Sequence, residues 1–202
     1  LKDLAARKTP RDFRAKLAQL SWRAGLPEAG LLALHAIVRP SERKKKEASV
    51  EEKLEYAACL MRLGATPEAL GILDSIAEPT PKTSLYRAFA YFGSWAYQEA
   101  IPLLQEFLEA PGEDPYQRLV AKVNLASALV FERQEVPATA LLRELLHDTS
   151  LHKHTRLLAN ALEISATHAV FLGDLAGAGT FLDRARTLLK ESNTVDRLFI
   201  DK

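Results

Sequence analysis

The stretch AACLMRLGATPEALGIL, residues 57–73, contains a spacing that returns along the whole chain. In it an alanine, Ala57, is followed twelve residues later by a small residue, Ala69, and four residues after that by Leu73. A small residue lets two helices cross closely, and a leucine one turn later fills the space beside the crossing. The spacing therefore predicts a helical hairpin whose two helices pack through these positions.

The same triplet occurs five times along the chain. The five sets are Ala18/Gly30/Leu34, Ala57/Ala69/Leu73, Ala88/Ala100/Leu104, Ala126/Ala138/Leu142 and Ala166/Ala178/Leu182. The middle residues follow one another at intervals of 39, 31, 38 and 40 residues, which is the range of helix-pair repeats. A hairpin with apolar residues on two faces cannot bury both by itself, so we expect the five hairpins to stack into an array.

The positions of proline, glycine and capping residues predict helix pairs and no strand. The pairs are expected at about residues 11–40, 50–79, 83–110, 115–148 and 150–191, and residues 192–202 should begin a capping or truncated helix. Thr83 or Ser84 is expected to cap the third pair, and Pro102 should be tolerated near a helix start. Because the turns within pairs are short, partner helices should be antiparallel neighbours.

Composition excludes several classes of function. The chain has 202 residues, of which 48% are hydrophobic and 26% charged, with a net charge of +1. This balance gives no general attraction to nucleic acid or to an anionic membrane, and no apolar stretch approaches the roughly 20 residues of a membrane span. We expect a cytoplasmic protein. Because the chain lacks an initiator Met and ends abruptly, we expect it to be a piece of a longer protein.

Three segments resemble the turn and second helix of a tetratricopeptide repeat: Gly64–Leu73, Trp95–Leu104 and Gly173–Leu182. The recurrent alanine of each first helix resembles that family's small residue. The resemblance covers almost the whole chain and implies an all-α superhelix, a tetratricopeptide-like solenoid of about five antiparallel pairs forming one domain over residues 1–202. The family repeats every 34 residues or so, whereas these units vary more widely, which indicates a divergent relative with an irregular pitch.

The resemblance also implies a concave groove, lined by the first helix of each pair, that binds a protein or peptide. The groove positions carried over are Gln19, Trp22, Arg23, Leu54, Met61, Arg62, Leu85, Phe89, Phe92, Val123, Ser127, Phe131, Asn160, Glu163, Thr167 and Phe171. The aromatic run 86–97 adds Tyr91 and Trp95 as candidate anchors. This groove is largely apolar and lacks the paired Lys/Asn clamp of some relatives, which favours an amphipathic helix or hydrophobic segment as partner. Packing between neighbouring units stays open as the alternative at each position.

The sequence predicts a non-catalytic, protein-binding scaffold without a cofactor. No combination of nucleophile, base and orienting group emerges from it. Its partner would be another protein, a peptide or an adjacent domain of the same chain, and nucleic acid is disfavoured by the net charge. An effector-binding or regulatory region of a larger multidomain protein, such as a bacterial transcription regulator, stays open as the alternative.

Several weaker signals are interpreted as structural. His147, His152 and His154 lie near Asp148 and could hold zinc, but we favour solvated histidines. His35 and His168 should be packing or groove residues, and Cys59 a buried small residue, since a single cysteine excludes an internal disulfide.

Two further segments suggest anion binding only superficially. Residues 173–179 have glycines like those of a phosphate loop but lack its Lys-Ser/Thr, so close helix packing explains them better. The basic residues 43–46 are expected to form a solvated connector rather than a nucleic-acid contact.

Overall fold

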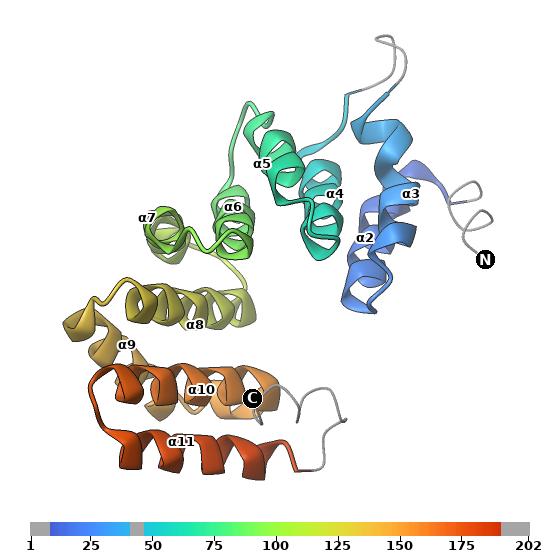
Figure 1. Cartoon of the computed structure of the whole chain (residues 1–202). Coiled ribbons are helices and arrows are strands. Elements are labelled where there is room, and N and C mark those ends of the chain that lie inside the picture. Colours follow the sequence, from blue (N-terminus) through green and yellow to red (C-terminus); the bar gives the residue numbers. More distant parts are fainter. Residues whose placement is uncertain (1–8, 41–46, 191–202) are drawn as a thin grey trace. The chain divides into compact units, whose positions relative to one another are not determined.

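The computed structural model describes residues 9–40 and 47–190, and these are helical almost throughout (Figure 1). The chain is all-α, as predicted, with no strand in the described part. It divides into two compact units, unit 1 up to Ala96 and unit 2 from Tyr97 onward, and each is described by itself. The predicted basic connector 43–46 and the predicted helix start at 192–202 lie outside the described residues.

The described part of unit 1 contains five helices. These are α2 (Arg11–Arg23), α3 (Pro27–Val38), α4 (Val50–Arg62), α5 (Thr66–Asp74) and α6 (Pro81–Gly93). The partners α2 and α3 pack together, as do α4 and α5, and α4 also contacts α2, α3 and α6. Each first helix therefore packs on the first helix before it and on the second helix of the preceding pair.

Unit 2 follows the same contact scheme. Its elements are α7 (Tyr97–Glu109), α8 (Pro115–Phe131), α9 (Glu135–His147), the short 3₁₀ turn η1 (Leu151–Lys153), α10 (Thr155–Phe171) and α11 (Leu175–Leu188). Within it α8 packs on α7, α9 and α10, while α10 also packs on α9 and α11. Figure 1 shows α10 and α11 lying side by side and joined at one end.

The recurrent Ala–small–Leu positions are interior positions of their helices. All fifteen residues are buried except Leu182, which is half-buried. At Gly30 the backbones approach so closely that an added Cβ atom would lie 3.2 Å from the Ala18 Cα and 2.5 Å from the Cys59 Sγ. The small residue is therefore needed where α2, α3 and α4 meet, as the spacing predicts.

One turn geometry ends the first helix of every pair. The five residues Gly25, Gly64, Trp95, Arg133 and Gly173 have positive φ angles and lie five residues before the small residue of their triplet. In each turn the following N–H donates to a carbonyl five residues back, at 2.9–3.0 Å, which is the Schellman motif. Glycine suits this left-handed position best, yet two of the five turns use a larger residue.

Helix starts follow the predicted prolines and caps, with one correction. The N-cap of α6 is Thr80, whose hydroxyl accepts a hydrogen bond from the Thr83 N–H. Thr83 is the third residue of that helix, and its own hydroxyl accepts from the Thr80 N–H, so the expected cap at Thr83 or Ser84 was wrong. Pro81 occupies the first helical position, where the missing N–H costs nothing. Pro102 lies inside α7 and is tolerated there.

Candidate functional site

A buried carboxylate lies among α2, α4 and α6, the first helices of the pairs in unit 1. Glu55 of α4 is 0% exposed and accepts three hydrogen bonds from neighbouring first helices. Gln19 Nε2 and Trp22 Nε1 of α2 donate at 3.1 and 2.8 Å, and the Tyr86 hydroxyl of α6 donates at 2.9 Å. This carboxylate therefore ties α2, α4 and α6 together, as a buried charge requires if it is to be tolerated.

Glu55 and its surroundings affect two further groups. Burial, and then the Glu55 charge, raise the pKa of the Tyr86 hydroxyl, so the phenol stays a donor. Burial raises the pKa of the Cys59 thiol to about 12, with Glu55 adding to the effect. Cys59 is thus a buried, unreactive thiol, and the prediction for this residue is confirmed.

Beside this network, two guanidinium groups lie over one indole ring. The Arg23 and Arg62 carbons Cζ are 5.4 and 5.2 Å from the centre of the Trp22 ring. Both arginines are exposed, and neither side chain makes a hydrogen bond or ion pair with another described residue. They occupy the same repeat position in α2 and α4, directly after the half-buried Trp22 and Met61. Three predicted groove residues, Trp22, Arg23 and Arg62, are therefore brought together.

The remaining groove residues of unit 1 divide by burial. Leu54 and Leu85 are fully buried, so packing accounts for them. Four predicted residues are half-buried: Met61, Phe89, Tyr91 and Phe92. Trp95 is 76% exposed and has the left-handed backbone conformation, φ +59°, in the turn that ends α6. The aromatic run thus has members in the interior and at the surface.

In unit 2 the predicted aromatic residues Phe131 and Phe171 form a row with Tyr97. The Tyr97 and Phe131 rings stack with centres 4.9 Å apart, and Phe171 meets Phe131 edge-on at 6.2 Å. The Arg133 guanidinium lies 4.5 Å from the centre of the Phe171 ring, and its Nη2 donates to the Phe171 carbonyl at 3.2 Å. The row connects the C-terminal ends of α8 and α10.

Five other predicted groove positions of unit 2 differ in exposure. Val123 is buried, Ser127, Glu163 and Thr167 are half-buried, and Asn160 is exposed. Because Val123 is buried, packing explains this residue. The aromatic row, in contrast, is built from residues of several helices.

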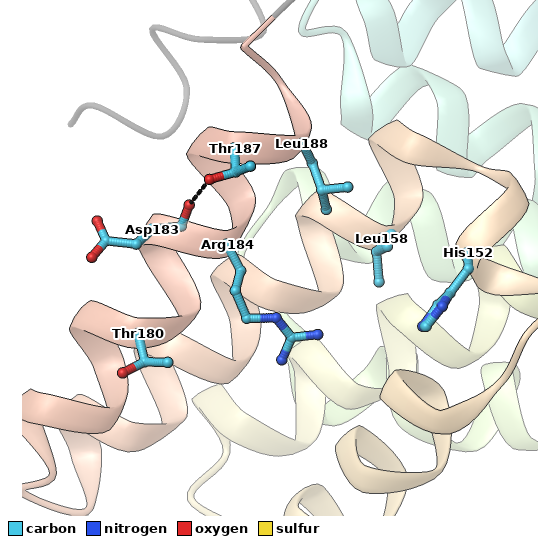
Figure 2. Close-up of a pocket in the computed structure, with 7 residues that line it drawn as sticks. All are labelled: His152, Leu158, Thr180, Asp183, Arg184, Thr187 and Leu188. Carbon is cyan, nitrogen blue, oxygen red and sulfur yellow. Dashed lines mark hydrogen bonds between the residues drawn. The ribbon is translucent and has the colours of Figure 1, made fainter.

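The larger of the two hollows described in unit 2 lies along α11 and measures about 570 Å³. Figure 2 shows Arg184 of α11 on one side of this hollow, with Leu158 of α10 and His152 of η1 on the other. The Asp183 carboxylate points away from this hollow, while its backbone carbonyl accepts from the Thr187 hydroxyl at 2.8 Å. No pattern in the sequence predicted this hollow.

A second hollow, which we call the α9–α11 cleft, measures about 310 Å³ and is lined by residues of α9, α10 and α11. Its buried part includes His168, whose Nε2 is 2.8 Å from the Thr139 hydroxyl. Burial lowers the pKa of His168, which favours the neutral ring. Arg143 and His147 lie at its exposed rim. Sequence reasoning assigned His168 to packing or the groove and missed this cleft.

The clustered histidines have separate partners. His147 Nδ1 is 2.7 Å from the Arg143 carbonyl, His152 Nε2 is 3.0 Å from the Leu146 carbonyl, and His154 meets the Tyr116 ring edge-on. Across residues 9–40 and 47–190, no group of three or more His, Cys, Asp or Glu side chains is placed to hold a metal ion.

The glycines of 173–179 have reasons other than close helix packing. Gly173 forms the left-handed turn, with φ +81°. At Gly177 an added Cβ would collide with Asp174, whose carboxylate caps α11 by accepting from the Gly177 N–H at 2.8 Å. Gly179 has open space around it. The expectation of close helix packing was therefore wrong for this segment.

Within the described residues, none of the helices has the length and apolar character needed to cross a bilayer. Comparisons of the chain with protein-family models, curated proteins and solved structures found no match. The assembled features are therefore the Glu55 network with its flanking arginines in unit 1, and the aromatic row and the α9–α11 cleft in unit 2.

Proposed function

We propose that this chain is a divergent tetratricopeptide-like solenoid that binds a segment of another protein and catalyses no reaction. The proposed binding surface lies in unit 1 and is formed by Trp22 and Arg23 of α2 with Met61 and Arg62 of α4. The bound segment would combine apolar side chains with one or more carboxylates.

The repeated local geometry supports the solenoid. The same Schellman turn ends five successive first helices, and the same contact scheme joins first helices to first helices within each unit. Units that repeat both turn and contacts are typical of helical arrays, and such arrays bind extended partners along one face.

The arginine pair is the single observation that carries the binding proposal. Arg23 and Arg62 stand over the Trp22 ring from adjacent helices, without an acidic partner among the described residues. Each guanidinium group keeps its hydrogen-bond donors available, and a carboxylate of a bound segment would form charge-assisted hydrogen bonds with them. The half-buried Trp22 and Met61 offer apolar area beside the charges, which is the combination that protein interfaces favour.

The Glu55 network supports the same surface by making it rigid. Because Trp22 donates its indole N–H to Glu55, the ring on which both guanidinium groups lie has a defined position. A preorganised surface loses less conformational entropy on binding.

The experiment selects binding peptides from a displayed library of random 12-residue peptides, with the whole chain as target. We expect the selected peptides to be enriched in Asp or Glu next to Leu, Ile or Phe. Binding of one selected peptide, measured by calorimetry, should weaken by about tenfold or more in the double variant Arg23→Gln/Arg62→Gln, and it should weaken as salt is added.

A matched control is Arg184→Gln/Arg186→Gln, which removes two exposed charges from α11 in unit 2. This variant should bind the selected peptide as the unmodified chain does. Equal losses in both double variants would point to net charge alone, and selection of peptides without acidic residues would contradict the proposal.

A further inference from the structure

The α9–α11 cleft occupies a place that a side chain fills elsewhere in the array. In two other helix pairs, the residue just before the recurrent alanine reaches the second helix of the preceding pair. Tyr56 of α4 places its hydroxyl 2.9 Å from His35 Nδ1 of α3. Arg87 of α6 forms an ion pair with Asp74 of α5 at 2.8 Å. The partner residue in both cases lies five positions after the small residue of its own triplet.

In the fifth helix pair, α10 and α11, this bridge to the preceding second helix is missing. The residue before Ala166 is Ser165, and the corresponding partner on the preceding second helix is Arg143. Ser165 is too short to cross, and its hydroxyl donates to the Ala161 carbonyl of its own helix at 2.8 Å. The Arg143 side chain makes no hydrogen bond or ion pair with another residue of the described ranges. Both residues line the cleft, so the cleft is the space that a larger bridging side chain would fill.

The chemistry of the lining limits what could fill that space. Leu142, Ala169 and Phe181 provide apolar walls, and Arg143 provides an exposed positive charge at the rim. The buried His168 is already paired with Thr139, so it presents no unsatisfied charge. The one acidic side chain among the described lining residues, at position 174, is engaged in capping α11. A volume of about 310 Å³ lies at the lower end of the range for small-molecule sites.

We infer that the α9–α11 cleft binds a small amphipathic monocarboxylate, with its carboxylate on Arg143 and its apolar body in the space left by Ser165. The ligand would complete the bridge between α9 and α10 in the way that the Arg87–Asp74 ion pair joins α6 to α5, with the charges exchanged. This inference concerns unit 2 alone and does not depend on the peptide-binding surface proposed for unit 1.

The test uses octanoate as probe, titrated into the whole chain and followed by calorimetry and by the NMR signals of the His168 ring. We expect octanoate to bind and to shift those signals. Octanol, which has the apolar body without the charge, should bind about tenfold or more weakly, and acetate, which lacks the body, should not bind up to about 10 mM.

Two variants test the two halves of the site. Arg143→Gln, at an exposed position that should not affect folding, is expected to weaken octanoate about tenfold and to leave octanol unchanged. Ser165→Leu gives the fifth helix pair the residue that precedes Ala126 in the fourth pair. This variant should abolish binding of both probes and raise Tm. Arg184→Gln, which removes a guanidinium group elsewhere in unit 2, is the matched control and should bind octanoate normally.

Three outcomes would overturn the inference. These are equal affinity for octanoate and octanol, unchanged octanoate binding in Arg143→Gln, and no octanoate binding up to about 10 mM. All three are measured on the unmodified chain and on Arg143→Gln, so the test stays complete even if a Ser165→Leu chain fails to fold.

Discussion

Replacing Glu55 by alanine should cost more stability than any change at an exposed residue of the same helix. The substitution removes the acceptor of three hydrogen bonds, from Gln19, Trp22 and Tyr86, in a place where the carboxylate is 0% exposed. Each donor left buried without an acceptor costs about 1–3 kcal/mol. Since water entering the space would satisfy some donors, we expect a total loss of about 4 kcal/mol in the free energy of unfolding.

The loss can be measured by urea unfolding followed through tryptophan fluorescence. The chain has two tryptophans, so a Trp95→Phe background leaves Trp22 as the reporter. Trp22 donates to the carboxylate that is removed, and its emission should therefore shift already in the folded state. Glu55→Gln keeps one acceptor oxygen and should lose less than the alanine variant.

The control is Glu51→Ala, one turn earlier on α4. Glu51 is exposed, and its carboxylate is 3.9 Å from the Lys82 ammonium, so its removal should change stability by less than about 1 kcal/mol. A loss below about 1 kcal/mol for Glu55→Ala would refute the reasoning, because it would mean that the three donors find other acceptors at little cost.

Three further predictions address the packing, the turns and the cleft. Gly30→Ala should lower the free energy of unfolding by about 1–3 kcal/mol, because the added Cβ would lie 2.5 Å from the Cys59 Sγ. Gly71→Ala, with open space around it, should stabilise α5 by up to about 1 kcal/mol. Urea unfolding measures both changes. Trp95→Gly should raise Tm, by the equivalent of about 1 kcal/mol, because φ +59° is strained for a residue with a Cβ; an unchanged or lower Tm would show that the indole contributes more than the strain costs. The pKa of His168 is lowered by burial from its usual 6.5, so the unfolded chain takes up the proton first and stability is lost as the pH falls below about 6.5; in His168→Gln, the decline of Tm between about pH 6.5 and 5 should be smaller.

The positions of the helices could be predicted well because their signals are local. The ranges of the helix pairs follow from glycine and proline positions, and the small residues of the triplets are buried as their spacing indicates. The Thr80 cap was missed because Thr80, Thr83 and Ser84 are all good caps, and only the backbone angles distinguish them. The left-handed turns at Trp95 and Arg133 were missed as a repeat because neither residue is glycine.

The candidate sites were much less predictable. Glu55 lies in the sequence between two residues of the apolar face, and nothing local distinguishes it from a solvated glutamate. Aligning the five helix pairs would have placed Glu55 on the side of its helix that faces the other first helices, and this was the one signal available. Its donors are 31 to 36 residues away in the chain, on α2 and α6.

The sequence by itself determined that this chain forms helix pairs with small residues at their crossings, because periodicity, turns and close packing are set by residues within one repeat. Only the tertiary structure decided which charge is buried, which arginines share an indole ring, and where a bridging side chain is missing. These features depend on pairs of residues from different repeats. Ser165 and Arg143 occupy the positions of Arg87 and Asp74 in their pairs, but only the packed helices show that Arg87 reaches Asp74 while the Ser165 hydroxyl bonds to its own helix.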